Sequence, residues 1–249
     1  MTDPVRPDPA ALVSLAGKTA LVAGGSGGIG AATSSLFLAA GARVVSVDLP
    51  GRGAVDGAVA IEADLGDPAG ARHAVAQATD AAGGLDIVVH SAGITRDAVL
   101  WKLSDDAWRD VLRVNLDSAF WLLREAAPIL RKSGEGAIVL VSSINGERGK
   151  FGQANYAASK AGLLGLARSA ARELGAFGVR VNAIAPGFID TPMTAALPEE
   201  LRRKAVEESA LGRMGSPEDV AAAILFLVSP LSRHVTGQVL RVDGGQLMA

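Results

Sequence analysis

From Lys18 onward, the chain alternates short apolar runs with longer segments whose apolar residues recur at helical spacing. This alternation is typical of repeated β-α units, which build a parallel sheet covered by helices on both faces. Several of the runs are β-branched and lack polar alternation, as expected for strands that are buried on both faces. The predicted strands are Thr19–Ala23, Arg43–Val47, Ala58–Glu62, Ile87–Val89, Ala137–Val141, Arg180–Ala185 and Gln238–Val242. The expected fold is therefore α/β, with a single doubly wound parallel sheet of about seven strands.

Helical spacing fills most of the connections between these strands. The predicted helices are Ile29–Ala40, Pro68–Ala82, Asp105–Leu130, Gln153–Gly175 and Pro217–Val228. The connection Leu49–Gly57 contains one proline and three glycines, so we expect a loop or a single turn there. Thr191–Ala210 is interpreted as a helical insertion that could act as a lid.

Composition places this fold in one domain and excludes several classes of function. Residues 1–14 are expected to form an extended lead-in, because the first ten include three prolines, and residues 15–249 a single domain. The net charge of −2 gives no general attraction for nucleic acid or an anionic membrane. The absence of cysteine and the presence of only three histidines argue against a metal site. With no signal-peptide pattern or membrane-length apolar stretch, we expect a cytoplasmic protein.

A glycine-rich turn follows the first predicted strand and precedes a predicted helix. It reads Gly24-Gly25-Ser26-Gly27-Gly28-Ile29-Gly30. Gly24, Gly28 and Gly30 stand where a backbone must turn tightly and approach a pyrophosphate. The turn therefore predicts a dinucleotide site in a Rossmann-like fold, with Ser26, Gly27 and Ile29 also beside the cofactor.

The choice between the two nicotinamide dinucleotides depends on opposed charges. Asp48 lies 18 residues after Gly30, at the end of the second strand, where its carboxylate can accept hydrogen bonds from ribose hydroxyls and repel a 2′-phosphate. Arg52 could instead bind that phosphate, which keeps NADP(H) as the alternative. NAD(H) is favoured because Gly27 places no cationic side chain beside the turn.

Four polar residues suggest the chemistry. Tyr156, the only tyrosine, and Lys160 share one helix face at i, i+4. A nearby ammonium and the positive nicotinamide ring should both lower the phenol pKa from its ordinary value of about 10. Ser143 follows the fifth strand and could donate to a substrate oxygen, with Ser142 as the alternative. Asn115 interrupts a predicted helix, where asparagine is unfavourable, so we expect it to have a specific partner.

Together these motifs resemble the short-chain dehydrogenase/reductase family, over nearly the whole chain from about Leu15 to Met248. The segments that carry the resemblance are the glycine turn, Asp64-Leu65, Ser91-Ala92-Gly93, Asn115, Ser143, Tyr156, Lys160, Pro186-Gly187 and Thr191. Ala23 and Ser91 depart from the family pattern, in which threonine and asparagine are usual, but neither departure removes a reacting group.

The resemblance implies a role for each matched residue. Tyr156 would be the acid/base, Ser143 would polarise the carbonyl, and Asn115 would anchor a proton-relay water. Lys160 would lower the tyrosine pKa and bind the nicotinamide ribose. The remaining implied cofactor contacts are Asp64 and Leu65 at the adenine, Ser91, Ala92 and Gly93 in the family's sheet-stabilising segment, and Pro186, Gly187, Ile189 and Thr191 at the carboxamide.

Within the family, residues 92–97, 152–162 and 185–191 look most like the 3-oxoacyl thioester reductases of fatty-acid synthesis, including acetoacetyl-CoA reductases. This resemblance implies interconversion of a 3-oxoacyl thioester and its 3-hydroxyacyl form. Family members mostly use NADPH, and many dock a carrier protein through basic residues where this chain has residues 175–178, Gly-Ala-Phe-Gly. We therefore do not expect carrier-protein delivery. A CoA thioester, another secondary alcohol/ketone pair, or a catalytically silent nucleotide-binding regulator remain the alternatives.

The resemblance also favours a homotetramer built from two-fold contacts. Small residues on one long helix and large apolar residues on another could pair across such an axis. They are Ala157, Ala161, Gly162 and Gly165 on the first, and Trp108, Leu112, Phe120 and Leu123 on the second.

Overall fold

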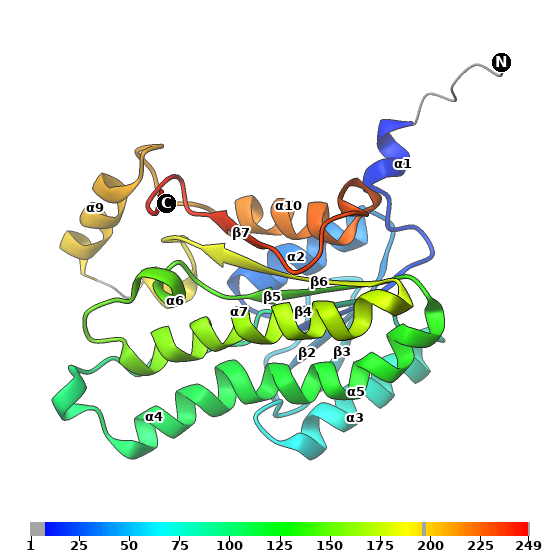
Figure 1. The fold of residues 1–249 in the computed structure, drawn as a ribbon, viewed down its shortest axis with the longest axis horizontal. Coiled ribbons are helices and arrows are strands. Elements are labelled where there is room, and N and C mark those ends of the chain that lie inside the picture. Colours follow the sequence, from blue (N-terminus) through cyan, green and yellow to red (C-terminus); the bar gives the residue numbers. More distant parts are fainter. Residues whose placement is uncertain (1–7, 196–197, 249) are drawn as a thin grey trace.

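The computed structural model describes residues 8–195 and 198–248, and its centre is one parallel seven-stranded sheet (Figure 1). The strands follow the order β3-β2-β1-β4-β5-β6-β7. They are β1 (Thr19–Ala23), β2 (Arg43–Asp48), β3 (Val59–Glu62), β4 (Ile87–His90), β5 (Gly136–Val141), β6 (Val179–Pro186) and β7 (Val239–Val242). The predicted doubly wound fold is confirmed, and each predicted strand agrees to within one or two residues.

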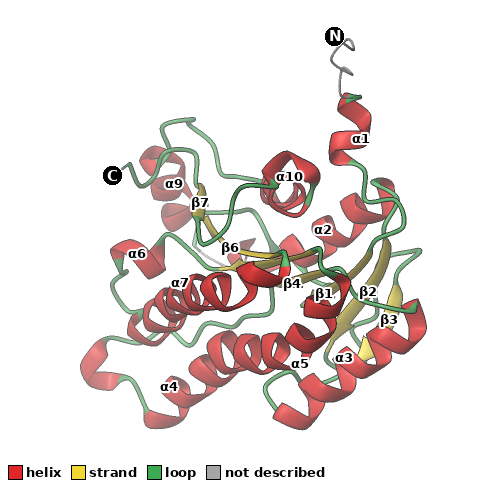
Figure 2. Ribbon diagram, turned by 45° about the vertical axis from the view of Figure 1, so that its right-hand side comes forward, coloured by secondary structure: helices red, strands yellow, loops and turns green. Residues whose placement is uncertain are grey.

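Helices cover both faces of the sheet (Figure 2). Helices α2 (Gly28–Ala39) and α10 (Pro217–Val228) cover one face, and α3 (Pro68–Ala82), α5 (Ser118–Ser133) and α7 (Ala154–Leu174) cover the other. The alternation of side chains along β1 explains this division. Ala20 and Val22 belong to the apolar core under α2 and α10, whereas Leu21 and Ala23 belong to the core under α3, α5 and α7.

One predicted helix is broken where it matters for the site. The expected continuous helix Asp105–Leu130 is instead α4 (Asp105–Leu112), a π-helical turn (Arg113–Asp117) and α5. A π turn inserts an extra residue into the helical ladder and is common at functional sites. The apolar periodicity on both sides is that of one helix, so the sequence pattern could not predict the break.

The predicted extended lead-in is wrong for its second half, while residues 1–7 lie outside the described residues. Pro9–Val13 forms the short helix α1, because Asp8 accepts from the Ala10 backbone N–H at 3.0 Å and Pro9 occupies the first turn. Residues 49–57 form turns without a helix, as predicted.

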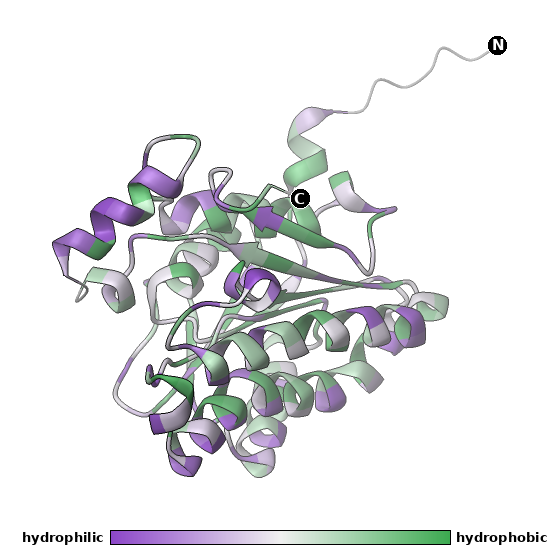
Figure 3. Ribbon diagram, turned by 60° about the vertical axis from the view of Figure 1, so that its left-hand side comes forward, coloured by the Kyte–Doolittle hydropathy of each residue, from purple (hydrophilic) through white to green (hydrophobic). Residues whose placement is uncertain are grey.

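The predicted insertion between β6 and α10 is helical. It contains α8 (Pro192–Ala195) and α9 (Glu199–Glu208), with residues 196–197 outside the described part. Figure 3 shows α9 as strongly hydrophilic beside the hydrophobic strands. The short helix α6 (Asn145–Arg148) completes this end of the molecule. Whether the insertion moves as a lid stays a prediction.

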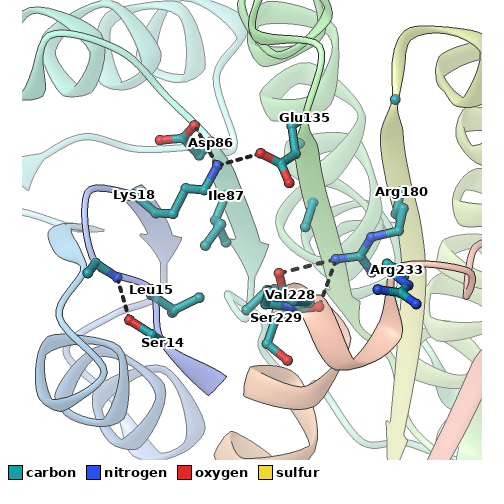
Figure 4. A pocket seen from close by; sticks show the side chains of 15 residues that line it. Ser14, Leu15, Lys18, Asp86, Ile87, Glu135, Arg180, Val228, Ser229 and Arg233 are labelled. Carbon is teal, nitrogen blue, oxygen red and sulfur yellow. Dashed lines mark hydrogen bonds and ion pairs between the residues drawn. The ribbon is translucent and has the colours of Figure 1, made fainter. Parts of the chain in front are cut away.

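At the amino-terminal edge of the sheet, a hollow of about 110 Å³ is lined by side chains that link neighbouring elements (Figure 4). Lys18 lies 3.0 Å from Glu135 and 3.8 Å from Asp86. Arg180 donates to the Val228 carbonyl at 3.1 Å and to Ser232 Oγ at 2.7 Å, so it satisfies the carboxyl end of α10. Burial lowers the pKa of this guanidinium. This edge is thus occupied by structural ion pairs and caps.

The opposite, carboxyl-terminal edge carries the topological switch point. After β3 the chain crosses to the other side of β1 and continues with β4, and in doubly wound sheets ligands bind in the crevice outside the carboxyl ends of the strands at such a reversal. Across the described residues, no helix has both the length and the apolar content needed to cross a bilayer. The cytoplasmic location stays a prediction.

Candidate active site

The glycine turn after β1 is compact enough to require its glycines. Gly24 has a φ of +73°, and a Cβ there would lie 2.8 Å from the Ala92 backbone nitrogen. A Cβ on Gly30 would overlap the Gly24 carbonyl oxygen, whereas one on Gly27 would meet nothing within 4 Å. The turn is therefore packed against the β4 loop on one side and open on the other.

The amino terminus of α2 fits a dinucleotide pyrophosphate. The helix begins after Gly27, which caps it with no side-chain hydrogen bond, and its first turn holds no acidic residue. The first backbone N–H groups of a helix have no partner within it, and together with the helix dipole they attract an anion. The residues present thus suit the cofactor that the motif predicts.

Asp48 is fixed at the end of β2, directly beside this turn. Its Oδ2 accepts from the Ser26 backbone N–H at 3.3 Å and from the Ser26 hydroxyl, and its Oδ1 accepts from the Leu49 N–H at 2.9 Å. Arg52 approaches Oδ1 only to 3.9 Å, and its side chain is 62% exposed against 16% for Asp48. A surface ion pair of this kind contributes little, so the anionic carboxylate dominates this position.

The predicted adenine-contacting pair lies at the carboxyl end of β3, beyond Asp48. Asp64 accepts from the Gly66 N–H at 2.8 Å and pairs with Arg113 at 3.2 Å, while Leu65 is buried. Arg113 belongs to the π turn and was not predicted from the sequence. Its guanidinium connects Asp64, the predicted adenine contact, to the segment that carries Asn115.

The segment that follows β4 packs against the glycine turn and comprises Ser91, Ala92 and Gly93. The Ser91 N–H donates to the Ala23 carbonyl at 2.9 Å, which continues the pairing between β4 and β1. A Cβ on Gly93 would lie 3.3 Å from Lys160 Nζ and 3.4 Å from Asn115 Oδ1. Glycine at this position therefore lets two of the predicted catalytic residues approach this segment.

The segment after β6 lies beside the glycine turn. Pro186 ends the strand, Gly187 donates to the Val242 carbonyl at 3.0 Å, and Ile189 is buried. Thr191 reaches the glycine turn, since its methyl carbon would lie 3.1 Å from a Cβ on Gly28. The structure therefore brings the predicted cofactor residues together along one edge.

Gln246, near the carboxyl terminus, ties this segment to the insertion. Its Oε1 accepts from the Phe188 N–H at 2.7 Å and its Nε2 donates to the Ala205 carbonyl of α9 at 3.0 Å. Ser209 adds a hydrogen bond to the Gly244 carbonyl at 3.2 Å. The last turn of the chain thus supports one wall of the crevice.

Asn115 has the specific partners that its position predicted. It is fully buried in the π turn, where Oδ1 accepts from the Ile94 N–H at 2.8 Å. Its Nδ2 donates to the Ile94 carbonyl at 3.1 Å and to Ser159 Oγ at 3.0 Å. Ser159 in turn donates to the Tyr156 carbonyl at 2.8 Å, so Asn115 is connected to the helix that carries the tyrosine.

The two candidate serines lie in different environments. Ser142 is buried and donates to the Lys160 carbonyl at 2.7 Å. Ser143 accepts from the Asn145 N–H at 3.1 Å, and its hydroxyl lies near enough to the Tyr156 phenol to lower the pKa of that phenol. This geometry favours Ser143 as the residue that shares a substrate oxygen with Tyr156.

The pKa values of the tyrosine and lysine correct one expectation. Burial raises the pKa of Tyr156 to about 12; the hydrogen bond from Ser143 lowers it and the charge of Asp97 raises it further. Burial lowers the pKa of Lys160 to about 8, and its Nζ donates to the Val141 carbonyl at 2.8 Å, 5.6 Å from the Tyr156 ring centre. The expected lowering of the phenol pKa is not seen in this structure, because burial outweighs it.

A polar chain beside the tyrosine was missed at the sequence level. Gln153 donates to Asp97 at 2.9 Å and accepts from Asn145 at 3.1 Å. The only available signal was the position of Gln153 just before the tyrosine-bearing helix. These contacts fix the loops on both sides of the Ser143–Tyr156 pair.

Comparison with known proteins identifies the class. The family described as Enoyl-(Acyl carrier protein) reductase matches residues 23–246. The chain belongs to the short-chain dehydrogenase/reductase family of oxidoreductases, as its motifs predicted.

The individual relatives of this chain have names that are more specific than the family. The 3-oxoacyl-(acyl-carrier-protein) reductase of Thermotoga maritima is 43% identical over 246 residues, covering 93% of this chain and 98% of the relative. The acetoacetyl-CoA reductase of Synechocystis sp. is 43% identical over 233 residues, covering 93% and 97%. The solved structure of a dehydrogenase/reductase from Sinorhizobium meliloti has a TM-score of 0.89 at 36% identity, covering 96% and 98%.

Proposed function

We propose that this chain interconverts a 3-oxoacyl thioester and its 3-hydroxyacyl form with NAD(H) as the preferred cofactor. The observation that carries the proposal is the proximity of two hydroxyls, Ser143 and Tyr156, beside a cradle that suits a dinucleotide. Two O–H groups that converge on one point are suited to bind a single carbonyl oxygen. The relatives named as 3-oxoacyl and acetoacetyl-CoA reductases support a 3-oxo substrate.

Each residue has a distinct part in the proposed reaction. With a phenol pKa of about 12, Tyr156 is protonated at neutral pH and can donate its proton to the carbonyl oxygen during reduction. Ser143 donates a hydrogen bond to the same oxygen as negative charge develops on it. Lys160, with a pKa of about 8, could return a proton to Tyr156, and Asn115 would anchor the water that relays it. A bound nicotinamide cofactor would supply the hydride that adds to the carbonyl carbon.

The residues proposed to hold this cofactor fall into three groups along the crevice. The N–H groups of the glycine turn would bind the pyrophosphate, and Asp48 would bind the adenosine ribose. Asp64 and Leu65 would contact the adenine, while the segment 186–191 would contact the carboxamide. The NAD(H) preference rests on the anionic Asp48 carboxylate and on the weak, exposed pairing of Arg52 with it.

We propose a CoA thioester as the substrate and a homotetramer as the assembly. Trp108 and Phe120 support the assembly, since these large aromatic side chains are 38% and 46% exposed. Two residues expected at the contact pack inside their own subunit instead: Leu123 is buried, and a Cβ on Gly162 would lie 2.7 Å from Leu116. A monomeric mass by light scattering at micromolar concentration would argue against the tetramer.

The test is cofactor oxidation by the purified protein, followed by absorbance. With acetoacetyl-CoA, NADH should be consumed, and consumption should be faster than with NADPH. Crotonyl-CoA, an enoyl thioester without a 3-oxo group, should give no turnover, which separates this reaction from enoyl reduction. Tyr156→Phe should lose turnover and keep cofactor binding. Cofactor binding without turnover of acetoacetyl-CoA or simple ketones would favour the silent regulator.

A further inference from the structure

A buried histidine lies behind the site and is not used by the proposed reaction. His90 ends β4, pairs in register with Ala23 and Leu140, and is fully buried. Its Nε2 lies 2.7 Å from Ser118 Oγ, and its Nδ1 has no hydrogen-bond partner among the described residues. Burying the unpaired Nδ1 is unfavourable, so the presence of an imidazole at this buried position needs an explanation.

The hydrogen bonds of Ser118 fix the direction of this contact. Its Oγ donates its only proton to the Val114 carbonyl at 2.6 Å. Its lone pairs can then accept from Nε2 of His90, in the tautomer that carries the proton on Nε2. A directed chain runs from the end of β4 through Ser118 to Val114.

This chain spans the π turn that carries Asn115. Val114 precedes Asn115 by one residue and Ser118 is the first residue of α5, so the hydrogen bond between them brackets the asparagine. Asn115 then holds the Ile94 N–H and Ser159 Oγ. The turn that carries the asparagine is thus joined to the end of β4 through the His90 imidazole, in addition to the contacts of Arg113 with Asp64 and with the Gly66 carbonyl.

We propose that His90 is a positioning residue, whose imidazole donates to Ser118 and so holds the π turn that presents Asn115 to the site. The inference rests on the proposed function for its kinetic consequence, but its structural part stands alone. Burial, together with the charge of Lys160, lowers the pKa of His90 to about 3, so the imidazole stays neutral and keeps this single donor at working pH.

The structural test is hydrogen exchange, which needs no substrate. His90→Leu removes the donor at similar volume, and His90→Gln keeps an amide donor of comparable reach. We expect the Ile94 amide, which binds Asn115, to exchange about ten-fold faster in His90→Leu and close to the wild-type rate in His90→Gln. The control His73→Leu, at an exposed position of α3, should change nothing. Unchanged Ile94 protection, or equal loosening of the whole sheet, would overturn the proposal.

The kinetic test is a double-mutant cycle with acetoacetyl-CoA. Displacing a positioned group commonly costs ten-fold or more in rate, so His90→Leu should lower kcat about ten-fold with KM within two-fold. In the Asn115→Ala background the same change should have no further effect on kcat. A full additional loss there would show that His90 does not act through Asn115.

Two further controls keep the outcomes separate. If His90→Leu fails to fold, Ser118→Ala cuts the same chain and should give the same exchange and kinetic results; an unaffected Ile94 amide in that variant contradicts the proposal. A wild-type protein without turnover would defeat the proposed function alone, because the exchange of Ile94 still decides the role of His90.

Discussion

Replacing Asp48 by asparagine isolates the charge that should decide cofactor preference. The carboxylate is only 16% exposed and is held by N–H groups of Ser26 and Leu49. Asparagine keeps the shape and one acceptor oxygen, so these contacts to the glycine turn can largely survive. What changes is the negative charge that faces a 2′-phosphate.

The size of the effect follows from Coulomb's law. Two unit charges about 4 Å apart repel by ~1 kcal/mol in water and by ~4 kcal/mol at an effective dielectric constant of 20. A partly buried carboxylate lies between these limits, so we take about 2–3 kcal/mol, which is ~30- to ~150-fold in NADP(H) affinity. NAD(H) loses a charged hydrogen-bond acceptor, a cost of about 1 kcal/mol. The preference for NADH over NADPH should therefore fall about 100-fold or more.

The assay is kcat/KM for both reduced cofactors with acetoacetyl-CoA. Asp56→Asn is the matched control, because it removes an equal charge from an exposed site in the same connection and should leave the ratio unchanged. Arg52→Ala should matter little in the wild type and should reduce the NADPH activity gained in Asp48→Asn. Wild-type kcat/KM equal or higher with NADPH would refute the NAD(H) assignment. A change in ratio below about three-fold in Asp48→Asn would refute the electrostatic reasoning.

Three other outcomes can be measured with the same protein. Ser143→Ala should lower kcat about 10²- to 10³-fold, as for loss of one oxyanion donor. Ser142→Ala should mainly lower thermal stability. The reverse pattern in steady-state kinetics would exchange the roles of the two serines. The unfolded chain keeps a proton on Lys160 up to a pH of about 10.5, whereas the folded chain releases it above about 8. The free energy of unfolding of the wild type, relative to Lys160→Met, should therefore rise by up to about 3 kcal/mol across that pH range. Denaturant titrations measure this difference, and a flat difference would contradict the lowered pKa. Gly30→Ala should weaken cofactor binding and lower the free energy of unfolding by about 1–3 kcal/mol, since its Cβ overlaps a carbonyl oxygen, whereas Gly27→Ala should fold normally; equal melting temperatures for the two variants would count against the packing argument.

The fold was predictable because the signal repeats along the chain. Each buried parallel strand is a short apolar run between helical segments, and the glycine turn identifies the first β-α unit. Asp48 could be placed for the same reason, as the residue that ends the next strand. These inferences need only local order and the rule that ligands bind at the carboxyl edge of a doubly wound sheet.

The parts that failed depend on contacts between distant segments. At the break at residues 113–117, Asn115 accepts from the Ile94 N–H and donates to Ser159 Oγ, and no helical periodicity reports such partners. The prediction for the pKa of Tyr156 failed for a similar reason: spacing put Lys160 on its helix face, but burial of the phenol by packed segments, which raises its pKa, cannot be judged from spacing. Helix α1 was missed because its prolines were interpreted as breakers, although proline is well tolerated in the first turn after an aspartate cap.

The contacts of Gln246 affect how the protein should be handled. Three residues from the carboxyl terminus, this side chain bridges the segment after β6 and helix α9, so anything fused there is attached to a wall of the crevice. Helix α1 lies at the other side of the molecule (Figure 1), far from α9 and close to the edge of structural ion pairs. Labels attached beside Gln246 would therefore act on the segment after β6 and on helix α9, whereas labels on helix α1 would lie away from both.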